Sequence, residues 1–222
     1  TAAGGAVRGM HANANLAYAL GAAARYEATG ERRSRWSAEA LWRELQQRYS
    51  FVSGGSSFQE EWRPASGVEE TLHHAGAGNW AAHDHSEQCV THHSMLLARR
   101  LISWLWPGGG GGGGGAAVEA SPELSEVVAL SEWTERTLYS SVLSSQRGTS
   151  PGVLLYMLPL GGGVSKAGGG HKWSSPESHF WCCMGSAVEA FGRLAESVYW
   201  RAGGGGGGAP RHLYLLQPTV TS

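Results

Sequence analysis

The chain has 222 residues, a formal net charge of −1, and only 16% charged residues. This balance excludes the basic surface typical of nucleic-acid or anionic-membrane binding, and no apolar stretch is long enough to cross a bilayer. Of the 34 glycines, 20 lie in four runs, at 108–115, 161–163, 168–170 and 203–208. Outside these runs the composition is that of an ordinary globular protein with one large or two small domains.

Five segments have the periodicity of helices. In the first, Leu16, Leu20 and Ala23 recur at helical spacing, and Gly30 lies just beyond its end. Ser86 is the candidate N-cap of the third, and a Ser-Pro pair opens the fourth. The predicted helices span residues 13–28, 35–49, 87–106, 121–142 and 185–199.

Two later segments are predicted to be strands, at 152–160 and 212–217. Helices therefore dominate the chain, and strands follow late. The two long glycine runs, 108–115 and 203–208, fall between predicted elements. Both are connections, and inserted residues are best tolerated in surface connections.

Three cysteines are too few, and odd in number, for a disulfide framework. Cys182 and Cys183 are adjacent, and Cys89 ends the sequence Ser-Glu-Gln-Cys. Because Glu87 and Cys89 are two residues apart at a helix start, both can face one centre. Together with the cysteine pair they offer three thiols and a carboxylate, a complete tetrahedral set for zinc. The alternative is three unrelated buried cysteines, since cysteine is among the most buried residue types.

Other side chains are candidates for chemistry. Glu60 and Glu61 follow a Gly-Gly-Ser-Ser loop beside aromatic residues, where a carboxyl group could be a general acid with a raised pKa. The alternative is a solvated loop charge. His83-Asp-His85 resembles a metal motif in a loop-like region, and His11 is either a helix cap or a ligand contact. No glycine run is followed by the Lys-Ser/Thr of a phosphate-binding loop.

Taken together, the sequence resembles the beta-L-arabinofuranosidase glycoside hydrolases of families 127 and 146, in particular the plant-type branch. The most specific elements are Phe-Trp-Cys-Cys at 180–183 and the upstream Glu-x-Cys at 87–89. The matching stretches occur in the family's order, at 11–31, 49–62, 86–104, 135–167 and 179–200. The chain departs from its relatives at Thr91-His92-His93 and in the elongated stretch 75–85.

The resemblance implies a mainly α fold. Residues 1–200 would form the second half of an (α/α)6 catalytic barrel, with the glycine-rich insert 108–115 and the strand segment 152–160 inside it. Residues 201–222 would be a glycine-rich linker and the start of a β-sandwich domain. Members of the family are longer than this chain, so we expect it to be part of a longer protein.

The resemblance also assigns roles to residues. A Zn²⁺ ion would be held by Glu87, Cys89, Cys182 and Cys183. The nucleophile would be Cys182, and the acid/base would be Glu60, with Glu61 as the close second. Substrate contacts would fall on His11, Glu135 and Tyr156.

The expected function is hydrolysis, with retained configuration, that releases beta-L-arabinofuranose from glycans or arabinosylated hydroxyproline-rich glycoproteins. We expect a carbohydrate substrate, no nucleic-acid partner, and a location in the secretory pathway or outside the cell. There, the reduced cysteines would need protection by zinc. Two alternatives remain: a non-catalytic glycan-binding or structural protein of the same fold, and an unrelated helical protein.

Overall fold

The computed structural model describes residues 6–63, 69, 84–106, 122–166, 173–175, 177–201 and 213–215. Three of the glycine runs lie outside these residues, including the predicted insert 108–115. His83 of the His-Asp-His motif also lies outside them. The remaining run, 161–163, belongs to an irregular segment.

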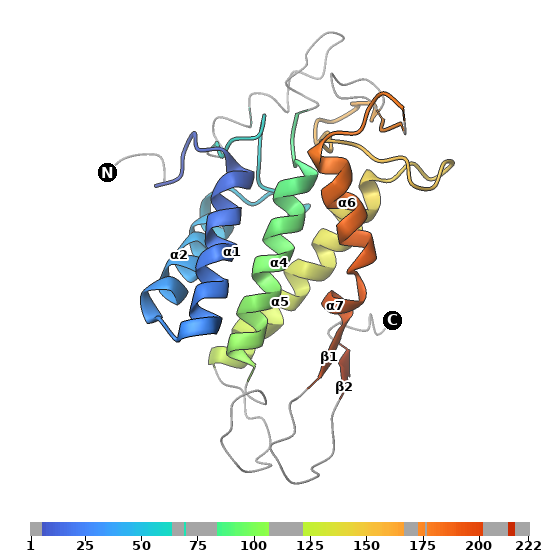
Figure 1. The fold of residues 1–222 in the computed structure, drawn as a ribbon. Coiled ribbons are helices and arrows are strands. Elements are labelled where there is room, and N and C mark those ends of the chain that lie inside the picture. Colours follow the sequence, from blue (N-terminus) through green and yellow to red (C-terminus); the bar gives the residue numbers. More distant parts are fainter. Residues whose placement is uncertain are drawn as a thin grey trace.

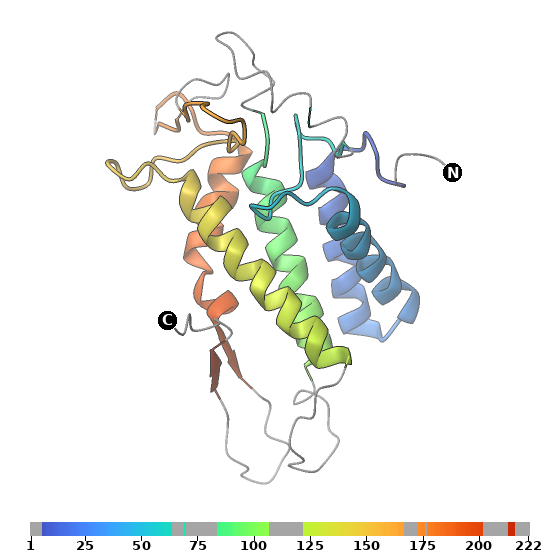
Figure 2. The ribbon, with the colours of Figure 1, turned by 180° about the vertical axis from the view of Figure 1, so that it is seen from behind.

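The described helices form two layers (Figures 1 and 2). Helices α1 (Ala12–Thr29), α4 (Gln88–Leu105) and α6 (Cys182–Gly192) lie side by side in the first layer. Helices α2 (Arg32–Arg48) and α5 (Pro122–Thr137) lie behind them in the second layer. In chain order, these five helices alternate between the two layers, as the helices of a partial α/α barrel would.

Small residues on the buried face of α1 allow this helix to pack closely against its neighbours. His11 is the N-cap, and Gly30 ends the helix with a φ of 72° that favours glycine. The face buried in the core has three alanines and one leucine, namely Ala12, Leu16, Ala19 and Ala23. Because alanine side chains are short, the α1 backbone can lie close to its neighbours.

Tryptophans fill the core and join the two helices of the second layer. The rings of Trp42 on α2 and Trp133 on α5 meet edge to face, with their centroids 4.8 Å apart at 86°. Such a pair contributes about 1 kcal/mol beyond its buried area. Trp62 is fully buried, and its Nε1 donates to the Ser56 hydroxyl at 3.2 Å. These tryptophans therefore have a structural role in the core.

All five predicted helices are present, with changes at their ends. The fourth continues past α5 as a π-helical turn, Leu138–Val142, and a 3-10 turn, Leu143–Ser145. The fifth begins three residues earlier than predicted, at Cys182, and is interrupted after Gly192 before the short helix α7 (Ala195–Val198). The earlier start places both adjacent cysteines in the first turn of α6.

The predicted strand 152–160 is wrong. This segment makes only isolated bridges, Leu154 to Gln146 and Met157 to Glu87. Its backbone alternates between neighbours, since the Leu155 N–H donates to the Ser145 carbonyl and the Tyr156 carbonyl accepts from the Gln88 N–H. The residues of this run are apolar because the segment is buried between the chain near Ser145 and the start of α4, and not because it pairs in a sheet.

The second predicted strand is present in shorter form. Strand β2 (Leu213–Leu215) pairs antiparallel with β1 (Tyr199–Arg201), whose first residue falls within the predicted helix 185–199. This two-stranded ribbon is the only sheet in the described part of the chain, so the expected β-sandwich stays a prediction. None of the described helices combines the length and apolar character needed to span a membrane.

Candidate active site

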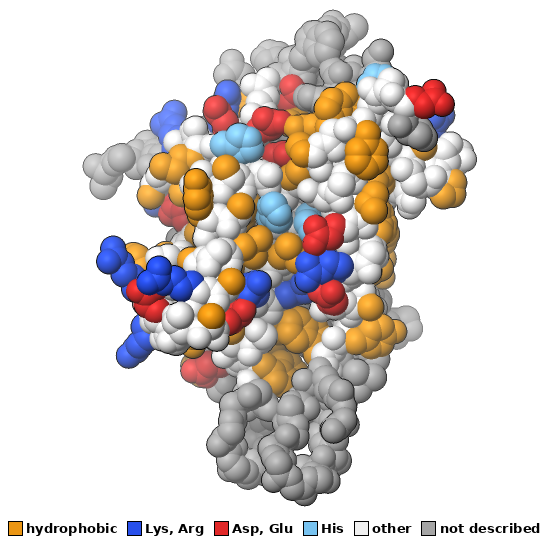
Figure 3. All heavy atoms as spheres, in the orientation of Figure 1, with side chains coloured by type: hydrophobic (Ala, Val, Ile, Leu, Met, Phe, Trp, Pro, Cys, Tyr) orange, Lys and Arg blue, Asp and Glu red, His pale blue; other side chains and the backbone are white. Residues whose placement is uncertain are grey.

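Three helices begin at one end of the first layer (Figure 1). His11 is the N-cap of α1, Glu87 is the N-cap of α4, and Cys182 is the first residue of α6. Figure 3 shows acidic and histidine side chains near this end of the same face. Because the free N–H groups of a helix N-terminus carry partial positive charge, carboxylates and thiolates are favoured there.

The start of α4 is shaped so that the Glu87 carboxylate stays available. The prediction that Ser86 caps this helix is wrong, because Ser86 adopts a φ of 51° and Glu87 occupies the N-cap position. The Glu87 side chain makes no capping hydrogen bond. Instead, the Ser57 hydroxyl accepts from the Glu87 N–H at 3.0 Å. The carboxylate is therefore free to face α6.

Four side chains converge between α4 and α6. Their potential ligand atoms all lie within 4.8 Å of one another. The Sγ of Cys183 is 3.1 Å from that of Cys89, 3.2 Å from Glu87 Oε1 and 3.9 Å from the Sγ of Cys182. Among the residues that the structure describes, this is the one such group of acidic, cysteine or histidine side chains. The convergence expected from the sequence is thus present.

The cluster is suited to hold a metal ion. It offers four donors, three sulfurs and a carboxylate oxygen, which is the number a tetrahedral site uses. Glu87 is buried, and its Oε2 has no hydrogen-bond partner. Burying an unsatisfied carboxylate oxygen is costly, and a bound cation would remove that cost.

Among the protein groups alone, the negative charge belongs on Cys89. Hydrogen bonds, first from Cys183 and then from Ser186, outweigh burial and lower the pKa of Cys89 to about 6. Burial, and then the charge of Cys89, raises the pKa of Glu87 to about 8. Burial also raises the pKa values of Cys182 and Cys183. A cation among the four would lower all four pKa values, because it stabilises every anionic ligand.

Tyr156 links this cluster to Glu60. Its hydroxyl donates to Glu60 Oε1 and lies 3.6 Å from the Sγ of Cys182. The other Glu60 oxygen is 3.7 Å from His11 Nε2. Burial, and then the hydrogen bond to Glu60, raises the pKa of Tyr156, so its hydroxyl keeps its proton. Cys182, Tyr156, Glu60 and His11 therefore form one continuous set of polar groups.

A tight turn positions Glu60. Phe58 and Glu61 exchange both backbone hydrogen bonds, at 2.9 and 3.0 Å, across the two-residue turn Gln59–Glu60. Both turn residues have positive φ, 49° and 64°, as in a type I′ turn. The turn sends the Glu61 carboxylate elsewhere, to 3.7 Å from Arg63. Thus Glu60, and not Glu61, contacts Tyr156.

Two glycines upstream bring this loop against the helices. A Cβ on Gly54 would lie 1.8 Å from Thr137 Oγ1, and one on Gly55 would lie 1.8 Å from Ser86 Oγ. Gly54 also has a φ of 91°. Only glycine fits at these positions, because any side chain would collide with the end of α5 or the start of α4.

Two further candidate residues are not among the four potential ligands. Glu135 is on α5, and its role as a substrate contact stays a prediction. His85, from the His-Asp-His motif, is fully buried, with the Phe58 ring 5.1 Å away and the Phe51 ring 6.0 Å away. It has the environment of a core histidine.

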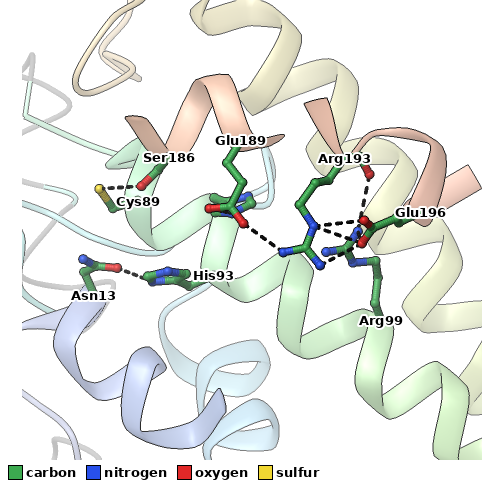
Figure 4. Close-up of polar contacts among 9 residues, drawn as sticks. Asn13, Cys89, His93, Arg99, Ser186, Glu189, Arg193 and Glu196 are labelled. Atoms are coloured by element: carbon green, nitrogen blue, oxygen red, sulfur yellow. Dashed lines mark hydrogen bonds and ion pairs between the residues drawn. The ribbon is translucent and has the colours of Figure 1, made fainter. Parts of the chain in front are cut away.

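His92 and His93 on α4 each contact a neighbouring helix, and Figure 4 shows the contact of His93 with Asn13 on α1. His92 Nε2 lies 3.3 Å from a carboxylate oxygen of Glu189 on α6, and His93 Nδ1 lies 2.5 Å from Asn13 Oδ1 on α1. Burial lowers the pKa values of both histidines. The histidines of the Thr91-His92-His93 stretch, where the chain departs from its relatives, therefore contribute to the packing of α4 against α1 and α6.

Sequence reasoning missed Ser186, whose hydroxyl donates to the Sγ of Cys89 at 3.1 Å (Figure 4). A signal was present in the spacing. Ser186 lies three residues after Cys183, so both occupy one face of a helix. It also missed that Tyr156 contacts Glu60 and Cys182 together, a relation between distant segments that no local pattern records.

A family model described as "Beta-L-arabinofuranosidase, GH127 catalytic domain" matches residues 3–196. The match covers both sides of the cluster and the Glu60 turn. A search of curated proteins gave no match.

Proposed function

We propose a substrate and a mechanism for this chain, which belongs to the beta-L-arabinofuranosidase GH127 family and is a glycosidase of that type. The proposed reaction releases beta-L-arabinofuranose, with retained configuration, from glycans or arabinosylated hydroxyproline-rich glycoproteins. The observation that carries the proposal is the Tyr156 hydroxyl, which contacts both the Glu60 carboxylate and the Cys182 thiol. One hydroxyl group thus joins a candidate acid/base to a candidate nucleophile.

The metal ion in this proposal is Zn²⁺. Glu87, Cys89, Cys182 and Cys183 would hold it, because three thiolates and one carboxylate suit its preference for four mixed sulfur and oxygen ligands. When bound, Zn²⁺ supplies the positive charge that keeps the Cys182 sulfur deprotonated at neutral pH. This chemistry is needed here because burial alone raises the pKa of Cys182.

In the first step, a lone pair of the Cys182 sulfur forms a bond to the anomeric carbon. The bond from that carbon to the aglycone oxygen breaks, and Glu60 protonates the departing oxygen. The position of Cys182 supports this role. It is exposed, whereas Cys89 and Cys183 are buried, so only its sulfur is open to a sugar.

In the second step, Glu60 is a carboxylate and removes a proton from water. The water oxygen bonds to the anomeric carbon, the carbon–sulfur bond breaks, and its electron pair returns to Cys182. Two successive displacements retain configuration. Inverting enzymes separate their two groups by roughly 6.5–9.5 Å to admit a water molecule, whereas here a single hydroxyl contacts both groups.

Tyr156 and His11 complete the proposal. Tyr156 stays protonated and donates to Glu60, so it orients the acid/base toward Cys182. His11 lies on the open side of Glu60, with about half of its side chain exposed. We assign it to contact the sugar at the rim of the site.

The test is hydrolysis of an aryl beta-L-arabinofuranoside by the full-length protein. Cys182→Ser and Glu60→Gln should each lower kcat by about 10²–10⁴-fold. The matched control is Glu61→Gln, the same change one residue along the chain, which should leave kcat within about threefold because Glu61 faces Arg63. The first product seen by NMR should be the beta anomer.

Two outcomes contradict the proposal. Loss of activity in Glu61→Gln with activity kept in Glu60→Gln would reverse the assignment of the acid/base. A wild-type protein that binds arabinosylated glycans, yet hydrolyses no furanoside, would instead be a non-catalytic glycan-binding protein.

A further inference from the structure

We propose that Ser186 is a positioning residue that holds the Cys89 ligand in place for the cation. The hydroxyl of Ser186 on α6 donates to the Sγ of Cys89 on α4 at 3.1 Å (Figure 4). Ser186 offers no ligand to the four-residue cluster and so acts through Cys89. The inference rests on the metal site proposed above, but not on the glycosidase reaction.

The direction of this hydrogen bond is unusual for a helical hydroxyl. Serine and threonine inside a helix commonly donate to the carbonyl one turn back. Ser131 and Thr134 on α5 and Thr91 on α4 do so, at 2.7, 2.8 and 3.1 Å. The hydroxyl of Ser186 instead reaches across to the neighbouring helix. The Ser186 side chain therefore joins α6 to α4 and does not bond to the α6 backbone.

The geometry of α6 gives Ser186 this reach. Cys182 and Cys183 lie four and three residues before it, so all three side chains lie on one face in consecutive turns. The two thiols meet the start of α4 from the first turn. The hydroxyl meets the same sulfur of Cys89 from the second turn. Two successive turns of α6 thus contact the sulfur of Cys89.

Cation binding makes the hydroxyl more important. In the protein alone, Cys89 accepts hydrogen bonds from both the Cys183 thiol and the Ser186 hydroxyl. A thiol must lose its proton to ligate a metal, so Cys183 then has none to donate. Of these two donors to Cys89, only Ser186 remains.

The charge of the site supports the same role. Three thiolates and a carboxylate carry four negative charges, and Zn²⁺ balances two of them. Hydrogen bonds to ligating atoms offset the excess and fix the ligand's orientation, and removing such a partner typically lowers metal affinity about 10–100-fold. Ser186 is well placed for this effect because Cys89 is buried, with 1% of its surface exposed, away from competing water.

The experiment measures Zn²⁺ affinity of the full-length protein by competition with a chromophoric chelator. Ser186→Ala should bind Zn²⁺ about 10–100-fold more weakly than wild type. Ser186→Thr, which keeps the hydroxyl, should restore most of the affinity. The matched control is Ser103→Ala, the same deletion on α4, where the hydroxyl donates to the Arg100 carbonyl at 2.7 Å. It should bind Zn²⁺ as wild type does.

A second measurement separates this role from a general loss of stability. With Co²⁺ in place of Zn²⁺, the thiolate-to-metal charge-transfer band reports directly on the bound sulfurs. Ser186→Ala should shift this band, whereas Ser103→Ala and Ser186→Thr should not. Circular dichroism should show a folded protein throughout, since alanine favours a helix more than serine does.

The outcomes are distinct. Equal Zn²⁺ affinity and an unchanged cobalt band in Ser186→Ala would overturn the inference while leaving the metal site intact. Failure of the wild type to bind Zn²⁺ would overturn both the inference and the metal site. Loss of hydrolysis activity alone would concern the proposed reaction and not Ser186.

Discussion

The Sγ atoms of Cys89 and Cys183 lie 3.1 Å apart, although the two residues are 94 positions apart in the sequence. One is in the first turn of α4 and the other in the first turn of α6, and both are buried. The contact exists because these two helices begin side by side at the same end of the first layer.

Removal of the metal should destabilise the fold. A cation that binds the native cluster, and not the unfolded chain, stabilises the protein by about 2.7 kcal/mol when its concentration is 100 times Kd. Addition of EDTA to the purified protein should therefore lower its Tm, and excess Zn²⁺ should restore it. Differential scanning calorimetry measures both changes. If EDTA left the Tm of a zinc-containing sample unchanged, that would contradict a metal site that holds α4 against α6.

Gly54→Ala should destabilise the protein by about 2–4 kcal/mol, because the new Cβ would meet Thr137 Oγ1 in a backbone with positive φ. Gly148→Ala is the matched control, since a Cβ there meets no atom within 4 Å. Its free energy of unfolding should change by less than about 1 kcal/mol. Urea denaturation of both variants measures the difference. Equal stability of the two would show that the loop does not press on the end of α5.

Tyr156→Phe should lower kcat by about 10–100-fold with little change in stability, because it removes the hydroxyl between Glu60 and Cys182 while keeping the ring. The ring packs edge to face on Trp181, with centroids 5.7 Å apart, and phenylalanine preserves that contact. The control is Tyr139→Phe, which deletes an exposed hydroxyl and should leave kcat unchanged. Steady-state kinetics on the aryl furanoside would contradict this role if the two variants were equally active.

Stability should fall as the pH drops below about 6.5. Burial lowers the folded-state pKa of His92, so the unfolded chain takes up this proton first and is favoured as the pH falls. Glu189, on α6, opposes the effect by attracting the protonated form, while His93 and Arg99, on α4, reinforce it by repulsion. His92→Gln should therefore lose less stability than wild type between pH 7 and 5 in urea titrations. If the free energy of unfolding changed equally with pH in His92→Gln and wild type, His92 would not be the source of the pH dependence.

Much of the candidate cluster could be predicted from the sequence because its residues are local pairs. Glu87 and Cys89 lie at one helix start, and Cys182 and Cys183 at another, so helix periodicity and ligand chemistry point to them together. What the sequence could not show is a relation between distant segments. The contact of Tyr156 with Glu60 depends on a turn of two non-glycine residues with positive φ, which carries no turn signature such as Asn-Gly.

The errors have a common physical cause. The apolar run at 152–160 predicts a strand, because burial of consecutive residues looks the same whether or not the backbone pairs in a sheet. Similarly, Ser86 has the chemistry of an N-cap but sits one residue too early, in a left-handed conformation set by its contact with the loop near Ser57. In both cases the tertiary environment overrode a local preference.

The cluster closes a large loop of the chain, because its two pairs of ligands enclose the whole segment from the start of α4 to the start of α6. The entropy cost of closing such a loop grows only with the logarithm of its length, by roughly 0.6 kcal/mol for each doubling. Three of the four glycine runs, at 108–115, 161–163 and 168–170, fall inside this loop. Variation in the length of these connections is therefore nearly neutral for the metal site, whereas a shift of α4 against α6 by a single turn would separate its ligands.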